Sequence, residues 1–376
     1  MHKLNGISAW TNIMKAPASQ WHGQIGRFSE PLVDIRHDAK FKIDIGDDFF
    51  CIGSCFARNI EEHLIYNGIA VQSRRIVSPK TEWSARPNGF TNKFTTHSIR
   101  NEIEWVINRP HIDETMFEER ADGWVDLQLS PGIKPVTLER AIERRAYLTD
   151  EYFSRVRGVS VIVLTLGLNE VWFDRALGRH LNAAPSFYAV RRQPDRYELQ
   201  STDFADNLSE LHEIHGLINQ INPHAHIVVT VSPVPLSETF SGDDIFVANM
   251  YSKSTLRAAA EVFARSNDNV VYYPTYEIVT MSPRANVYAQ DCLHVSDAVV
   301  GSLMRGFLKA YLDIDTNAES FNEIAYMTAN PDVEDALRRG ELTSCFEHWT
   351  RFGRGEGRAL RPADGPTPLM IAAGIP

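Results

Sequence analysis

The chain has 376 residues, of which 43% are hydrophobic and 23% are charged, and its net charge is −10. This length and composition predict a globular protein of about two domains with an ample core. The negative charge argues against a nucleic-acid binder held by phosphate contacts, and no apolar run approaches the ~18 residues that a membrane span needs.

The four cysteines are spaced as isolated thiols, because none forms a CxxC pair. In a chain of this length they predict neither a disulfide scaffold nor a structural zinc site. We therefore expect a reduced, cytoplasmic setting and no metal or cofactor. The first residues, Met1 to Gly6, carry no seven-residue apolar run and are not expected to form a secretory signal.

The N-terminal part of the chain lacks a clear hydrophobic period. Residues 1–46 are predicted to form an irregular arm packed on the domain. The apolar run at residues 48–53 predicts a buried strand. Residues 55–66 have apolar side chains at helical spacing, and Asn67-Gly68 is a good helix C-terminus.

Strands and helices then alternate along the chain. The near-continuous apolar run at residues 159–167 is typical of a parallel strand covered on both faces. The other elements that we expect are helices at residues 96–108, 203–221 and 247–266, and strands at residues 225–232 and 270–274. This alternation predicts an α/β fold with a doubly wound parallel sheet.

One predicted helix carries a basic face. Arg140, Arg144 and Arg145 lie at helical spacing, with Glu139 and Glu143 among them. We interpret this face as solvated and internally paired.

The character of the sequence changes from about residue 316 onward. Residues 316–376 are predicted to form a small module of two or three short helices, with a loose Gly/Pro-rich tail from residue 353. The stretch from Phe321 to Arg358 resembles a module appended to bacterial polysaccharide-handling proteins, which suggests a surface-glycan context. We thus expect an α/β domain at residues 47–315 between the arm and this module.

The most informative stretch is the turn after the first strand. Ser54 and Cys55 place a hydroxyl and a thiol at a strand–helix turn, where the helix dipole favours a thiolate or an oxyanion. Ligands of doubly wound sheets bind beyond the carboxyl ends of the strands. This turn lies at such an end, as does the run at residues 167–169.

Acyl transfer needs a nucleophile, a base, a group that orients the base, and donors for the oxyanion. His294 is the candidate base, and Asp291 can fold back within one turn to hold its imidazole. The side-chain amide of Asn169 is a candidate oxyanion donor. The backbone N–H of Gly89 is another, because a glycine allows close approach of a substrate.

Three aromatic residues are candidates for substrate binding. Trp83, Trp172 and Tyr251 have faces that suit a sugar. The alternative is that they are ordinary core or rim aromatics.

Five stretches occur in one order between residues 45 and 310: Gly53 to Ala57, Thr165 to Trp172, Tyr251 to Ser254, Tyr273 to Glu277 and Asp291 to His294. Together they resemble the GSCFA family, which is similar to the SGNH (GDSL-type) hydrolases. The resemblance implies a three-layer α/β/α fold and an esterase-like or acyl-transferring site.

The SGNH blocks map onto this chain with two departures. The Asp-x-x-His block matches Asp291 to His294, and the Gly-x-Asn-Asp block matches Gly167 to Asn169, with Glu170 in the place of the aspartate. The isolated glycine of the superfamily corresponds to Gly89 or to Gly68.

The second departure concerns the nucleophile. The superfamily has Gly-Asp-Ser, so an ungapped alignment puts Ser54 in the place of the aspartate and Cys55 in the place of the serine. Cys55 would then attack, with a thiol pKa lowered by the helix N-terminus and by His294. A turn one residue tighter would make Ser54 the nucleophile instead.

These residues predict an acyl-transfer enzyme (an esterase, thioesterase or O-acyltransferase) that acts on an acylated glycan or a small acyl ester. The alternatives are a non-catalytic glycan- or acyl-binding module, and a cysteine amidase or peptidase that uses the same residues. The sequence predicts no nucleic-acid partner and does not determine an oligomeric state.

Overall fold

A five-stranded parallel sheet forms the centre of the molecule. The computed structural model describes residues 3–28, 30–44, 46–312, 321–372 and 375. The strand order is β10-β9-β5-β1-β2. The strands are β1 (Asp48–Gly53), β2 (Ala70–Val71), β5 (Val161–Leu166), β9 (His226–Val231) and β10 (Val270–Tyr272). The predicted doubly wound sheet is confirmed.

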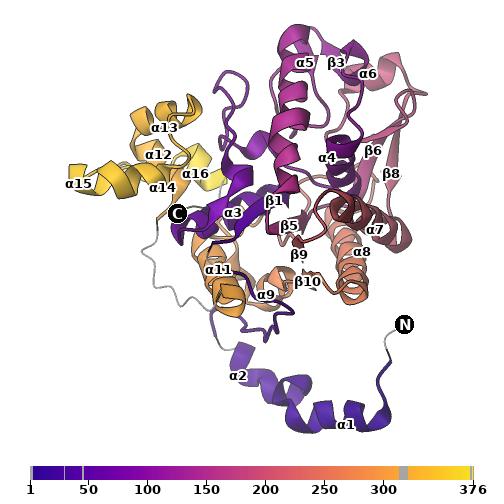
Figure 1. The fold of residues 1–376 in the computed structure, drawn as a ribbon, viewed down its shortest axis with the longest axis vertical. Helices are drawn as coiled ribbons and strands as arrows, with labels where there is room; N and C mark the ends of the chain where they lie inside the picture. The colour runs from indigo at the N-terminus through magenta and orange to yellow at the C-terminus, as the bar shows by residue number, and fades with distance from the viewer. Residues whose placement is uncertain (1–2, 29, 45, 313–320, 373–374, 376) are drawn as a thin grey trace.

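Helices cover both faces of this sheet (Figure 1). Alternate side chains of β1 enter different cores: Phe49 and Cys51 join one cluster, and Phe50 and Ile52 join the other. Because both faces are buried, the strands read as continuous apolar runs. One face is covered by α3 (Cys55–Tyr66), α9 (Thr275–Met281) and α11 (Asp297–Leu312), and the other by α4 (Thr96–Ile107), α7 (Phe204–Ile221) and α8 (Ile245–Ser266).

Two glycines bring the carboxyl ends of β1 and β5 together. Gly53 pairs with Thr165 and has φ +150°, and a Cβ there would lie 2.8 Å from the Thr165 backbone nitrogen. A Cβ on Gly167 would lie 2.8 Å from the Phe94 carbonyl oxygen. A side chain at Gly53 would push the two strand ends apart, and one at Gly167 would displace the backbone of Phe94.

The segments on either side of β5, between α4 and α7, form an insertion of which only the helix α5 (Leu138–Tyr147) was predicted from the sequence. The insertion also contains the hairpin β3 (Glu118–Arg120) and β4 (Gly123–Val125), the helix α6 (Phe187–Arg192), and an antiparallel sheet of β7 (Arg179–Leu181), β6 (Glu170–Asp174) and β8 (Tyr197–Ser201). These strands have three to five residues and many polar side chains, so they show no clear hydrophobic period.

The prediction of a solvated basic face on α5 is wrong for two of its three arginines, whereas Arg140 is partly exposed and pairs with Glu143 at 2.8 Å as expected. Arg145 is fully buried, and its guanidinium lies 2.8 Å from Glu102 and 2.7 Å from Asp126. Arg144 is also buried and is paired with Glu82 at 2.8 Å. The carboxylates that neutralise these arginines come from distant segments, so local charge spacing could not reveal them.

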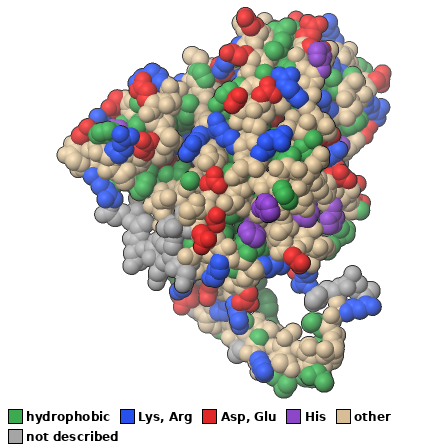
Figure 2. Space-filling view, viewed as in Figure 1, with side chains coloured by type: hydrophobic (Ala, Val, Ile, Leu, Met, Phe, Trp, Pro, Cys, Tyr) green, Lys and Arg blue, Asp and Glu red, His purple; other side chains and the backbone are tan. Residues whose placement is uncertain are grey.

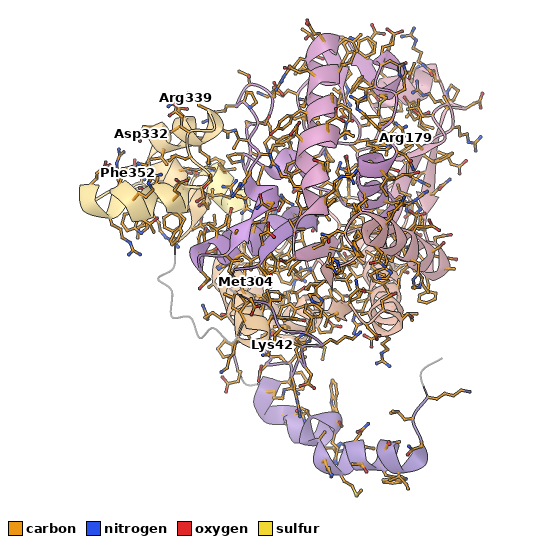
Figure 3. The ribbon with its side chains drawn as sticks, in the orientation of Figure 1. Lys42, Arg179, Met304, Asp332, Arg339 and Phe352 are labelled. Carbon is orange, nitrogen blue, oxygen red and sulfur yellow. The ribbon has the colours of Figure 1, made fainter. Side chains whose placement is uncertain are left out.

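The N-terminal arm differs in part from the prediction. Residues 33–43 do pack on the domain: Val33 and Ile43 are buried, and Nζ of Lys42 (labelled in Figure 3) donates to the Ala310 carbonyl at 2.9 Å. The helices α1 (Gly6–Lys15) and α2 (Ile25–Phe28) instead project from the body and contain no buried side chain among their described residues. Figure 2 shows hydrophobic side chains exposed on this projection.

The C-terminal module comprises α12 (Glu323–Ala329), α13 (Pro331–Arg338), α14 (Cys345–His348), α15 (Arg354–Glu356) and α16 (Pro368–Ala372). It lies beside α3, where the rings of Tyr66 and Phe321 are 5.4 Å apart (Figure 1). The predicted loose tail is wrong in part, because Met370 and Ile375 are buried in the core of the module. The expected domain boundary at residue 315 lies outside the described residues.

No helix in the described residues combines the length and the apolar character that crossing a bilayer requires.

Candidate active site

The turn after β1 presents two potential nucleophiles in different environments. Ser54 is the N-cap residue of α3, and Cys55 is the first residue of that helix. Ser54 is only 3% exposed, and its Oγ has no hydrogen-bond partner among the described residues. Cys55 is partly exposed.

The Asp-x-x-His segment folds into a tight turn before α11. Oδ1 of Asp291 accepts the backbone N–H groups of Leu293 and His294 at 2.9 and 3.0 Å. Its Oδ2 lies 2.7 Å from Nδ1 of His294, which leaves Nε2 for another partner. Cys292, at φ +56°, makes the fold-back possible and is exposed.

The carboxyl group of Asp291 is suited to hold the imidazole. Its partial burial acts to raise its pKa, but the hydrogen bonds from the His294 ring and from two backbone N–H groups lower the pKa overall. An ionised Asp291 fixes the proton on Nδ1 and favours an imidazolium when Nε2 accepts a proton.

A cavity of about 340 Å³ opens at the carboxyl ends of the strands and contains Ser54, Cys55 and His294 in its wall. Its volume is within the usual range for small-molecule sites. Most of the remaining wall is apolar and comes from the insertion and from the loop after β9; it includes Val125, Leu127, Ile133, Leu199, Val234 and Leu236.

A second cavity, of about 170 Å³, meets the same two catalytic candidates from another side. Cys55 and His294 line it together with Trp83, Arg86 and Leu369. Ser54 is not among the described residues that line this second cavity. The thiol and the imidazole therefore lie where the two cavities meet.

Lys253 of α8 is a site residue that the sequence reasoning missed. Its side chain is 1% exposed, lines the first cavity, and donates from Nζ to the Gly167 carbonyl at 2.7 Å. Burial lowers its pKa to about 7, and its charge interacts with Cys55. A lysine among the buried positions Leu256, Ala260 and Phe263 at helical spacing was the available signal.

The expectation of a lowered thiol pKa is wrong. Burial raises the pKa of Cys55 above its ordinary value. Arg86, Lys253 and the backbone N–H groups of Phe56 and Cys55 lower this pKa only part of the way back. The resting state therefore favours a thiol, and a base must remove its proton as the thiol attacks.

The structure does not bring the two predicted oxyanion donors into the first cavity. The Asn169 amide donates to the Thr202 carbonyl at 3.1 Å, and Asn169 is not among the described residues of the cavity wall. The N–H of Gly89 donates to the Arg86 carbonyl at 2.8 Å. Gly68 forms the C-terminal turn of α3, with φ +79°.

Other donors interact with the nucleophile. They are the N–H groups in the first turn of α3 and the ammonium group of Lys253. The first N–H groups of a helix have no partner within the helix, so they are available to an anion.

The three predicted aromatic residues are in different places. Trp172 lines the first cavity, and Trp83 lines the second. Tyr251 is 48% exposed and is not among the described residues that line either cavity. Glu170 also reaches the first cavity, where it accepts the N–H of Phe240 at 2.9 Å and so holds the loop after β9.

No cluster of three or more His, Cys, Asp and Glu side chains able to hold a metal ion occurs in the described part of the chain.

The fold and the site define a doubly wound α/β protein with a nucleophile turn, a buried lysine and an Asp–His pair at one edge of its sheet. The model of the GSCFA family matches residues 48–307, and the chain belongs to that family.

Solved structures with a similar arrangement include two carbohydrate esterases. One is a family 3 enzyme from Talaromyces cellulolyticus, with 11% identity and a TM-score of 0.32 over 70% of this chain and 96% of that one. The other is a family 2 enzyme with a carbohydrate-binding domain from Corynascus thermopiles (Myceliophthora fergusii), with 12% identity and a TM-score of 0.32 over 74% of this chain and 67% of that one. No curated protein matches the chain.

Proposed function

We propose that this protein is an acyl-transfer enzyme that cleaves O-acyl esters, with Cys55 as nucleophile, His294 as general base and Asp291 as the residue that orients His294. The observation that carries the proposal is the position of Cys55 and His294 in the walls of both cavities. The 2.7 Å contact between His294 and Asp291 supports it, because it leaves Nε2 to act on the nucleophile.

The first step forms a thioester. Sγ of Cys55 attacks the carbonyl carbon while Nε2 of His294 takes the thiol proton. The N–H groups at the start of α3 and the Lys253 ammonium hold the oxyanion. The intermediate collapses with cleavage of the C–O bond, and the imidazolium returns the proton to the leaving alkoxide.

The second step releases the acyl group. Water, or a second alcohol, loses a proton to His294 and attacks the thioester carbonyl, and Cys55 regains its proton from the imidazolium. Water gives an esterase and an alcohol gives an O-acyltransferase. The apolar wall of the first cavity supports the acyl group as its occupant.

A test is the hydrolysis of 4-nitrophenyl acetate and of an acetylated hexoside by wild type, Cys55→Ala, Ser54→Ala and His294→Ala. We expect kcat/KM to fall by at least about 100-fold in Cys55→Ala and His294→Ala and by much less in Ser54→Ala, because the first two remove the nucleophile and the base. Mass spectrometry of the trapped acyl-enzyme should place the acyl group on Cys55.

Four results would revise the proposal. An acyl group on Ser54 would make the hydroxyl the nucleophile. Faster cleavage of a matched amide than of the ester would identify an amidase. Full activity of folded His294→Ala would reject the mechanism, and binding of the acetylated hexoside without turnover would favour a binding module.

A further inference from the structure

The second cavity joins the α/β domain to the C-terminal module. Its wall includes Cys55 and His294 on the domain side. Ile324 of α12 and Leu369 of α16 complete the wall from the module side. Residues more than 250 positions apart in the sequence thus enclose a space that reaches the proposed nucleophile.

The module is fixed to the segment that carries Trp83. The guanidinium of Arg338 donates to the backbone carbonyl groups of Ser78, Trp83 and Ala85 at 3.0 to 3.1 Å. A buried ion pair at 2.9 Å also joins Arg74 to Glu323. These contacts fix the position of the module wall of the cavity relative to the domain wall.

The lining of this cavity suits a hydroxyl-bearing ring. Asn92 is 7% exposed, and its Oδ1 has no hydrogen-bond partner among the described residues, so it lacks a donor. Arg86 and Asn59 add polar groups, and they contact each other at 2.8 Å. Trp83 adds an aromatic surface, and its indole N–H is already held by the Arg86 carbonyl at 2.8 Å.

We propose that the second cavity binds the alcohol part of the ester, a sugar ring, while the first cavity binds the acyl group, and that the C-terminal module completes this sugar subsite. The inference rests on the proposed function. A sugar hydroxyl both donates and accepts, so it can satisfy Oδ1 of Asn92 and accept from Arg86, and a sugar face packs against an indole. The small volume fits one ring.

The test compares two esters of acetic acid, methyl 6-O-acetyl-glucopyranoside and methyl acetate, which share the acyl group and differ in the alcohol. Leu369→Trp fills the second cavity, and Asn92→Leu removes its unpaired acceptor. Each should lower kcat/KM for the acetylated sugar at least about tenfold more than for methyl acetate, because a lost buried hydrogen bond or a steric block costs ~1.4 kcal/mol or more.

Ile371→Trp is the matched control. Ile371 lies on the same short helix, is 46% exposed, and is not among the described residues that line the cavity, so this variant should leave both rates unchanged. Leu369→Trp changes the module side of the cavity, and Asn92→Leu changes the domain side. The thermal unfolding midpoint of each variant reports whether it is folded.

The outcomes separate the two proposals. If wild type hydrolyses both esters and the variants lower both rates equally, the sugar subsite is rejected while the acyl-transfer function stands. If wild type hydrolyses neither ester, the proposed function fails and the subsite fails with it.

Discussion

At the scale of single residues, the pair of Cys55 and Lys253 determines how the nucleophile can work. Burial disfavours charge on both groups: it raises the pKa of the thiol and lowers the pKa of Lys253 to about 7. The ammonium form of Lys253 favours the thiolate, and this form predominates only below pH 7. The influence of Lys253 on the thiol should therefore be lost as the pH rises through about 7.

This predicts the effect of Lys253→Met on alkylation of Cys55 by iodoacetamide. Below pH 7 the variant should react about tenfold more slowly than wild type, since one pKa unit changes the thiolate fraction about tenfold. Above pH 8 the two rates should converge, because the wild-type lysine is then neutral. Peptide-resolved mass spectrometry measures the rate, with the exposed Cys292 as an internal control. A rate difference that does not depend on pH would contradict the electrostatic role.

At the scale of the elements, the site depends on a strand–turn–helix unit that only glycine can close. Gly53 combines φ +150° with close contact to Thr165 on the neighbouring strand. The strand, the turn and the helix were each predictable from local apolar spacing. The contact with β5 was not, because it depends on strand order.

Gly53→Ala should therefore destabilise the protein by ~3 kcal/mol through backbone strain and overpacking. Gly158→Ala is the control, since no atom of the described residues lies within 4 Å of a Cβ there and its φ is −119°, and it should change stability by less than ~1 kcal/mol. Urea unfolding of both variants measures the difference. Equal stability of the two would show that the turn relaxes without strain.

At the scale of the whole molecule, the C-terminal module contributes Ile324 and Leu369 to the wall of the second cavity. Asp332, Arg339 and Phe352, labelled in Figure 3, mark its outer side, while Glu323 anchors its inner side. The carboxylate of Glu323 accepts from Arg74 and from the N–H groups of Cys345 and Phe346 at 2.8 to 2.9 Å.

Removing this carboxylate should loosen the module. Glu323→Ala leaves the buried Arg74 unpaired, and we expect a loss of ~3 kcal/mol, seen as faster limited proteolysis of the module. Glu341→Ala removes the exposed pair with Arg339 and should leave the rate of proteolysis close to that of wild type. Identical proteolysis of the two variants would show that Glu323 does not anchor the module.

The sequence alone determined the doubly wound sheet, the nucleophile turn and the Asp291–His294 pair, because each depends on the pattern of residues within a short segment of the chain. It did not predict that Lys253 interacts with Cys55, that Asn169 lies outside the wall of the first cavity, or that Leu369 lines the second cavity. Those outcomes depend on how α8, the insertion and the C-terminal module pack against the carboxyl ends of the strands. Burial also reversed the expected pKa of Cys55, and burial is a property of the folded chain rather than of any local segment.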